Sequence, residues 1–213
     1  MNGKFKFLLA FLLLNLLDEI SGHGMLMDPV NRASRWRFDS TAFADYNDME
    51  GFCGGFVVQW QQNQGKCGLC GDNYRDSTPR KHELGGHYGQ GVIVKSYKRG
   101  SVIEVTAKIT ANHYGYFYFK ICNLDAESET EACFERNKIP ISTGALSYPL
   151  PSSSTGDFKV SLRLPSNLIC NRCVLQWTYV AGNNWGVCPD GSGRLGCGTQ
   201  EHFRTCSDIR ITN

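Results

Sequence analysis

The segment Ser101–Thr110 reads SVIEVTAKIT and the segment Tyr114–Cys122 reads YGYFYFKIC, and apolar and polar side chains alternate along both. Alternation with a period of two is typical of a β-strand that buries one face. The same pattern recurs in residues 157–164 and 173–180, and further strand candidates cover 91–97 and 207–212. We therefore expect an all-β fold, an antiparallel immunoglobulin- or fibronectin-like β-sandwich with long disulfide-stapled loops.

The N-terminal part of the predicted domain is expected to form the long loops that disulfides hold together. Residues 23–89 are rich in Gly, Asn, Asp and Cys, which predicts irregular loops with a short helix over 56–62. The chain has 10 cysteines. An even number in a secreted chain predicts disulfides, whose pairing the spacing leaves open. The pairs Cys67/Cys70 and Cys170/Cys173 also allow two zinc knuckles, which their wide separation and an oxidising compartment disfavour.

The N-terminus indicates secretion. Two lysines precede an apolar run over residues 7–17, and the small residues Ser21 and Gly22 suit a signal peptidase. That run is too short to span a bilayer. We expect a signal peptide over 1–22 and a single domain over 23–213, extracellular and monomeric, with no membrane contact after processing. The formal net charge of +2, without a basic stripe, makes nucleic acid a poor partner. The alternative to a signal peptide over 1–22 is a buried N-terminal helix.

Cleavage after Gly22 makes His23 the first residue of the mature chain. Such a histidine offers two nitrogens, the α-amine and Nδ1, and a second imidazole gives a planar all-nitrogen set that suits Cu(II). Four histidines are candidates for this second ring: His82, His87, His113 and His202. His113 lies between two predicted strands, a rigid position for a ligand.

The sequence HELGGH over 82–87 requires a separate interpretation. It is similar to the metalloprotease signature HExxH but has one residue too many. Histidines at i and i+5 do not share a helix face, and two adjacent glycines disfavour a helix. We therefore interpret His82 and His87 as surface loop histidines and disfavour a metalloprotease.

Three motifs together resemble lytic polysaccharide monooxygenases. Residues 23–36, HGMLMDPVNRASRW, follow the form HGxLxxPxxRxxxW of their mature N-terminus. Residues 111–113, ANH, resemble their second-ligand motif, and residues 200–209, QEHFRTCSDI, resemble their final strand. The cysteine-rich CGLCGDNY over 67–74 is similar to the animal branch, auxiliary activity family 15. The resemblance spans nearly all of the mature chain.

The resemblance implies a role for each matching residue. His23 and His113 are the expected ligands of a single copper ion, and Phe203 is expected on its axial side as the third catalytic residue. Ala111, Gln200 and Glu201 are expected to surround them, with His202 as a non-ligand. The loop and strand-end aromatics are expected to contact the sugar chain: Tyr46, Tyr74, Tyr114 and Trp185. From the residue types alone, Trp36 and Trp177 are predicted to lie in the core and Asp208 to be a structural acid.

The implied activity is oxidative cleavage of an insoluble β-1,4-linked polysaccharide, with chitin as the leading substrate and cellulose next. Copper cycles between Cu(II) and Cu(I), an external reductant supplies electrons, and O2 or H2O2 is the co-substrate. A non-catalytic chitin-binding protein and a copper-storage or copper-sensing protein are the alternatives. No pair of carboxylates stands out as a catalytic acid and base, so glycoside hydrolysis lacks support.

Overall fold

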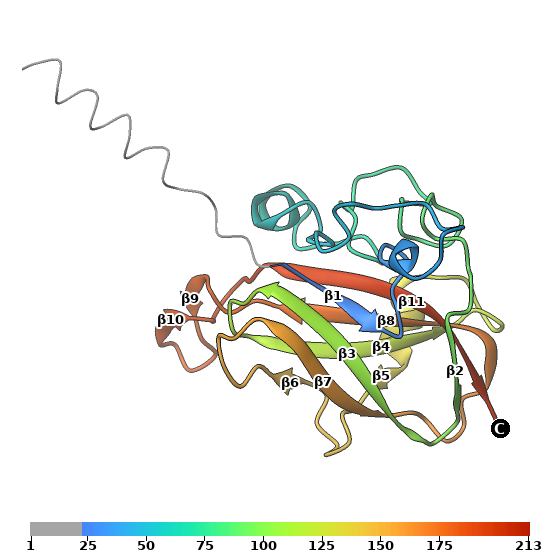
Figure 1. The fold of residues 1–213 in the computed structure, drawn as a ribbon. Helices are drawn as coiled ribbons and strands as arrows, with labels where there is room; N and C mark the ends of the chain where they lie inside the picture. Colours follow the sequence, from blue (N-terminus) through green and yellow to red (C-terminus); the bar gives the residue numbers. More distant parts are fainter. Residues whose placement is uncertain (1–22) are drawn as a thin grey trace, which may run out of the picture.

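The structure is a computed structural model that describes residues 23–213, so the predicted signal peptide lies outside the described residues. Two sheets face each other (Figure 1). The smaller sheet has the order β1-β3-β7, formed by β1 (His23–Asp28), β3 (Val102–Ala111) and β7 (Gly156–Arg163). The larger has the order β2-β11-β8-β4-β5 with β6 beside β4, formed by β2 (Lys95–Lys98), β4 (Tyr116–Asn123), β5 (Lys138–Ile139), β6 (Tyr148–Pro149), β8 (Cys170–Val180) and β11 (His202–Thr212). The β-sandwich prediction is confirmed.

The core lies between the two sheets and follows the alternation of the sequence. On β3, Ile103, Val105, Ala107 and Ile109 are buried while their neighbours along the strand face outward. They meet side chains of the larger sheet, of which Trp177 is fully buried, as predicted. Fully burying a large apolar side chain contributes about 1.5–3 kcal/mol, so this layer supplies most of the driving force for folding.

Three elements differ from the sequence-based expectation. His23–Asp28 is a strand rather than a loop, and it packs tightly, since a Cβ on Gly24 would lie 2.6 Å from the Cδ1 atom of Ile109. Strand β2 begins at Lys95 and runs parallel to β11, in an otherwise antiparallel sheet. Helix α2 (Glu131–Arg136), which Thr130 caps, is too short to give a helical period in the sequence.

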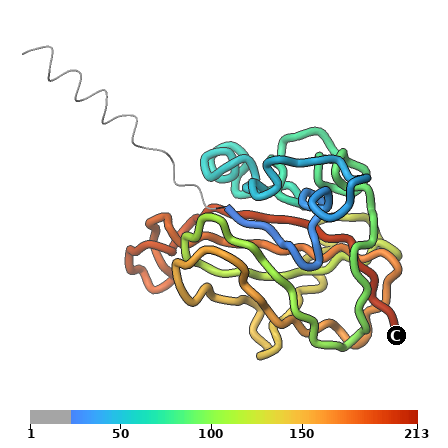
Figure 2. Tube along the Cα trace, in the orientation of Figure 1, coloured from blue at the N-terminus to red at the C-terminus, as the bar shows by residue number. Residues whose placement is uncertain are grey.

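Residues 29–94 form a layer of loops against β11 (Figure 2). The layer contains the short helical turns η2 (Arg35–Arg37) and η3 (Val58–Gln62), and the second confirms the predicted helix over 56–62. Backbone bonds fix the layer, since the amide of Arg32 donates to the Cys206 carbonyl at 2.8 Å and the amide of Arg204 donates to the Gly51 carbonyl at 2.7 Å. No helix in the described part of the chain is long and apolar enough to cross a membrane.

All of the cysteines are paired. The disulfides are Cys53–Cys67, Cys70–Cys206, Cys122–Cys133, Cys170–Cys173 and Cys188–Cys197. The disulfide prediction is confirmed and the zinc-knuckle alternative is wrong, because Cys67 and Cys70 belong to different bridges and no thiolate is left to bind a metal. The Cys70–Cys206 bridge joins the loop layer to β11.

Buried charges reinforce this junction. The guanidinium of Arg32 donates to Asp208 at 2.8 and 2.7 Å and lies 2.9 Å from a carboxylate oxygen of Glu129. All three side chains are almost fully buried. Asp208 is therefore a structural acid, as the sequence predicts, and Arg32 connects the loop layer with β11 and with the segment before α2.

Candidate metal centre

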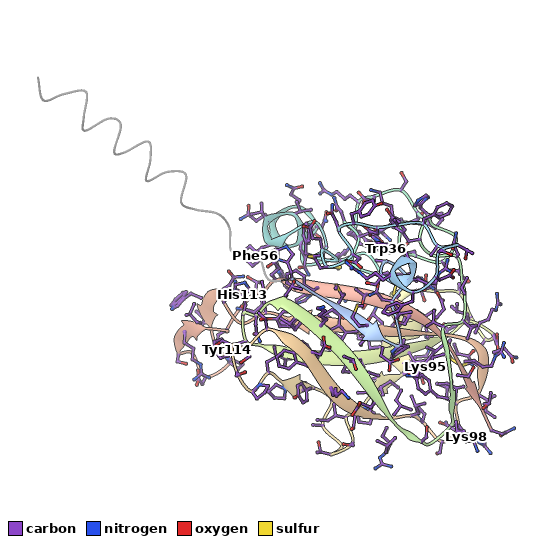
Figure 3. All side chains as sticks on the ribbon, in the orientation of Figure 1. Trp36, Phe56, Lys95, Lys98, His113 and Tyr114 are labelled. Carbon is purple, nitrogen blue, oxygen red and sulfur yellow. A yellow bond between two sulfur atoms is a disulfide. The ribbon has the colours of Figure 1, made fainter. Side chains whose placement is uncertain are left out.

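His23 and His113 lie at the same end of the smaller sheet. His23 is the first residue of β1 and pairs with Ala111, the last residue of β3, and His113 follows two positions later. The hydroxyl of Thr110 donates to the His23 carbonyl at 3.4 Å, which ties the two chain segments together at this end. Strand pairing therefore brings together two histidines that are far apart in the sequence, and Figure 3 shows His113 at this edge of the sandwich.

The backbone of His113 is fixed on both sides. Its amide donates to the hydroxyl oxygen of Tyr179 at 2.9 Å, and its carbonyl accepts from the amide of Gly182 at 2.8 Å. Both partners belong to β8 or the turn after it. The ring of His113 is thus attached to a main chain that has little freedom to move.

The chain reverses sharply after His113. Tyr114 has a φ of 56° and Gly115 a φ of 82°, and the first value is unusual for a bulky residue. The side chain of Asn112 holds the turn by accepting from the Tyr114 amide at 2.8 Å. A Cβ on Gly115 would lie only 1.9 Å from the Val180 carbonyl oxygen, so glycine is required where the turn presses against β8. Backbone strain of this kind is common beside functional residues.

The Nε2 atom of His113 fits a metal ligand. It is buried and has no hydrogen-bond partner among the described residues. Burying a polar atom without a partner is costly, and a metal ion is a partner that satisfies an imidazole lone pair. Together with the histidine nitrogens of residue 23, this atom gives the all-nitrogen donor set that suits copper.

The ring of His23 lies beside Glu50 and Phe203. Its Nε2 atom is 3.8 Å from a carboxylate oxygen of Glu50, and its centroid is 6.3 Å from that of Phe203. The Glu50 carboxylate faces Nε2, on the opposite side of the ring from Nδ1. Phe203 is fully buried and stacks on Tyr179 at 5.6 Å between centroids, so the two rings form the floor under this end of the sheet.

Glu50 is a residue that the sequence analysis missed. Its position depends on its neighbours, since the Met49 carbonyl accepts from the Gly24 amide at 3.3 Å. A Cβ on Gly51 would lie 2.4 Å from the Arg204 carbonyl oxygen, so the loop approaches β11 more closely than any other residue type allows. The only signal in the sequence is the dipeptide Glu50-Gly51 itself, which is too common to single out.

Gln200 and Glu201 are both buried below this end, with different roles. The amide group of Gln200 bonds the backbone of Asn184 in both directions at 3.0 Å and donates to the Cys197 carbonyl at 2.7 Å. Gln200 therefore holds the segment between β8 and β11. Burial raises the pKa of Tyr179 to about 12, and the charge of Glu201 adds to this rise, so the phenol keeps its proton.

Of the four aromatic candidates, two lie at the metal end. Tyr114 follows His113 and is 55% exposed. Trp185 is 67% exposed on a hairpin of β9 (Trp185–Val187) and β10 (Gly193–Leu195), which is tied down through Asn184. The Leu195 side chain opposite Trp185 is equally exposed, so the hairpin offers an apolar face beside the histidines.

The other two aromatic candidates lie in the loop layer. Tyr46 packs edge-on against Trp36, and Figure 3 shows Trp36 well separated from His113. Tyr74 lies between the cations of Lys66 and Arg80. The prediction that Trp36 belongs to the core is wrong, because it is half-buried within the loop layer.

The remaining histidines do not join the centre. The Nδ1 atom of His202 is 3.0 Å from Nε2 of Gln59, and burial lowers the pKa of His202 to about 4, so this ring is neutral and already partnered. His87 is exposed and stacks on Phe43 at 4.3 Å, which confirms a surface role. His82 does not have the predicted surface role, because it is largely buried between Asp45 and Asp72 at 2.8 Å from each.

The burial of His82 opposes its charge, but the hydrogen bonds to Asp45 and Asp72 outweigh that effect and raise its pKa to about 9. A pKa above the unfolded value near 6.5 gives stability that is fully present below pH 6.5 and lost as the pH rises through 9. The natural protein is expected to have a higher free energy of unfolding than His82→Gln at pH 6. This difference is expected to shrink by up to roughly 3 kcal/mol between pH 6 and pH 9.5. Urea unfolding at both pH values measures this, and a difference that stays constant with pH contradicts it.

Comparison with known proteins agrees with this geometry. Residues 23–209 match the model of a family described as lytic polysaccharide mono-oxygenase, cellulose-degrading. An AA15 lytic polysaccharide monooxygenase from Thermobia domestica, solved in the Cu(I) state, is 42% identical over 89% of this chain and 98% of its own, with a TM-score of 0.85. The cellulose-active CelS2 in complex with copper is 16% identical over 88% of this chain and 98% of its own, with a TM-score of 0.47. No curated protein sequence matches the chain.

The family match covers almost all of the described residues, including both histidines, and the similar structure extends over the whole sandwich. The chain belongs to the lytic polysaccharide monooxygenase family.

Proposed function

We propose that the mature chain begins at His23, that His23 and His113 hold one copper ion, and that the protein uses it to cleave a β-1,4-linked polysaccharide outside the cell. The observation that carries the site is the buried, unpartnered Nε2 atom of His113 at the sheet end where His23 lies. In this assignment residues 1–22 are a signal peptide and residues 23–213 are one catalytic domain.

The donor set supports copper. The amine and Nδ1 of His23 would chelate the ion, and Nε2 of His113 would add a third nitrogen. Glu50 lies on the Nε2 side of the His23 ring, at 3.8 Å, so it orients the ring while leaving Nδ1 toward the metal. Copper has the highest affinity of the first-row divalent ions for nitrogen sites of this kind.

Bound copper supplies one-electron redox chemistry that turns O2 or H2O2 into an oxidant, after an external reductant has given an electron. The chain supplies the surroundings. Phe203 has no ligating atom, so its buried ring would shield a copper ion held by the histidines without binding it, and the Tyr179 phenol stacked on it stays protonated. The small side chain of Ala111 would leave room for the co-substrate, and Gln200 and Glu201 are buried near the histidines.

The exposed rings beside the histidines suit a flat insoluble substrate. Tyr114 and Trp185 present apolar faces at the metal end, and the hairpin adds Leu195. We propose chitin as the principal substrate, on the resemblance to the animal branch, and cellulose as the second, on the description of the family model. Tyr46 and Tyr74, in the loop layer, remain predicted contacts of the sugar chain.

The test uses mature protein beginning at His23, loaded with one equivalent of copper and incubated with ascorbate and either chitin or cellulose. Mass spectrometry is expected to show products oxidised at carbon 1 or carbon 4 of the sugar. The matched control carries Gly22 ahead of His23, which converts the amine into an amide and is expected to abolish both tight copper binding and products. Pull-down on chitin without products supports the binding protein instead, and tight copper binding with neither result supports storage.

Removal of the Tyr179 hydroxyl is expected to loosen the second histidine. In Tyr179→Phe the amide of His113 loses its acceptor, and loss of a group that orients a ligand typically costs about 10–100-fold in metal affinity. Titration of the copper-free protein with Cu(II) measures this. Tyr148→Phe is the matched control, because that hydroxyl makes no hydrogen bond to any residue of 23–213. Equal copper affinity in the two variants contradicts the prediction.

A further inference from the structure

The outer face of β4 carries a groove that the metal centre does not use. It has a volume of about 280 Å³ and is lined by Tyr116, Tyr118, Phe119, Lys120, Glu135, Lys138, Leu146 and Ser147. The alternation of β4 creates it, because Phe117 and Phe119 point into the core whereas Tyr116 and Tyr118, which alternate with them, point outward. Its volume is close to the lower end of the range for small-molecule sites, enough for a short stretch of a ligand.

Two tyrosine rings form the base of the groove. The centroids of Tyr116 and Tyr118 are 6.4 Å apart, and the planes are inclined by 38°. Tyr116 is 40% exposed, and the Leu146 side chain opposite is 54% exposed. Tyrosine combines an apolar face with a polar tip, so a row of such rings suits a ligand with alternating apolar and hydroxylated surfaces.

The charged groups around the rings are all paired with one another. The ammonium group of Lys120 contacts Glu135 and lies 3.3 Å from a carboxylate oxygen of Glu131, and Lys138 lies 3.1 Å from Glu135. The contact with Lys120 lowers the pKa of Glu135, which keeps that carboxylate ionised. Glu131 also pairs with Arg204 at 3.1 Å, so three cations share two carboxylates, and each charged group already has a partner of opposite sign. They provide hydrogen-bonding groups at the rim, which an uncharged, hydroxyl-rich ligand can use.

One end of the groove lies at the start of β4, which follows His113 closely in the sequence. Tyr116 begins β4 three positions after His113, and the β6 residues Tyr148 and Pro149 pair with this start of the strand. Tyr118 lies farther along the strand, so the groove leads away from the histidines. A polymer chain that leaves the metal end along β4 therefore meets Tyr116 first and Tyr118 second.

We infer that this groove binds a single β-1,4-linked oligosaccharide chain, at a site separate from the metal centre. The Tyr116 ring stacks on one sugar unit, and Tyr118, whose ring has the Lys120 ammonium over it at 5.2 Å, contacts the next unit with its remaining exposed surface. Glu135 and Lys138 bond hydroxyl or acetamido groups at the rim. The choice of ligand class rests on the proposed function, whereas the site itself is built from side chains that bind no metal.

The test separates the two proposals by omitting copper. Mature protein treated with EDTA is titrated with chitotetraose and with cellotetraose, and binding is followed by calorimetry and by amide chemical shifts. We expect binding of at least one of them, with shifts along β4 and near Leu146. Tyr116→Ala is expected to weaken it about 5- to 10-fold, as truncation of a central aromatic contact does. Tyr116→Phe keeps the ring and is expected to bind nearly as well.

The controls distinguish the groove from other surfaces. Phe38→Ala removes an aromatic ring that is 69% exposed in the loop layer and is expected to leave binding unchanged. His113→Ala is expected to bind the oligosaccharide like the natural protein, even if it has lost copper. Absence of binding, binding unchanged in Tyr116→Ala, or binding lost only in Trp185→Ala overturns the inference. So does a concentration-dependent dimer that Leu146→Glu dissociates, since the groove then serves a second copy of the chain.

Discussion

Replacement of His113 by alanine is expected to abolish oxidised products and to weaken copper binding by more than about 100-fold. The variant removes one of three proposed nitrogen ligands, and even loss of a group that only orients a ligand costs about 10–100-fold. The fold is expected to persist, because His113 is only half-buried and its backbone bonds to Tyr179 and Gly182 do not involve the ring. Activity and fold are therefore separable in this variant.

Thermal unfolding with and without copper gives a readout that does not depend on activity. A ligand that binds only the native state raises the unfolding temperature in proportion to the logarithm of its excess over Kd. The natural protein is expected to show this rise, and His113→Ala is expected to lose it. His87→Ala, which removes an exposed loop histidine, is the matched control. A copper-induced rise of normal size in His113→Ala contradicts the proposed site.

The sequence predicts most of the long strands because pleating imposes a period of two on every half-buried strand. Strands β3, β4, β7 and β8 all lie within a few residues of the predicted segments. Strand β1 escapes this signal since its pattern of burial does not alternate, Gly24 through Leu26 being buried in succession. The parallel pairing of β2 with β11 depends on where the loop layer delivers the chain, which no local pattern encodes.

The proposed metal centre also contains residues that the sequence predicts and residues that it does not. His113 is predictable because it lies between two strands, and His23 because it follows the predicted signal-peptide cleavage site. Glu50 is not predictable, since it reaches His23 only through a loop whose path is fixed by Gly51 and by the Cys70–Cys206 bridge, which spans 136 positions. The side of the molecule on which an exposed aromatic such as Tyr46 lies depends on the same loop path.

Arg32 is expected to contribute most to the stability of the junction between the loop layer and the sandwich. In Arg32→Ala, the carboxylates of Asp208 and Glu129 remain buried without their cation, and breaking such a pair costs about 3–5 kcal/mol. For a chain of this size that corresponds to a fall in unfolding temperature of roughly 10 °C. Lys159→Ala is the matched control, because its partner Glu104 and the lysine itself are mostly exposed and such pairs contribute less than about 1 kcal/mol.

The pH dependence identifies the cause of this loss. Burial already raises the pKa of Glu129 while Arg32 acts to lower it, so the alanine variant is expected to raise that pKa further. A carboxyl whose folded pKa is raised binds protons more tightly in the native state, so it destabilises the fold increasingly as the pH rises. The difference between Arg32→Ala and the natural protein should therefore shrink toward pH 4.5 and widen toward pH 7.5, measured by urea unfolding. A difference independent of pH would indicate lost packing of the arginine side chain rather than stranded charge, and would remove the electrostatic account of how the loop that carries Glu50 is held against β11.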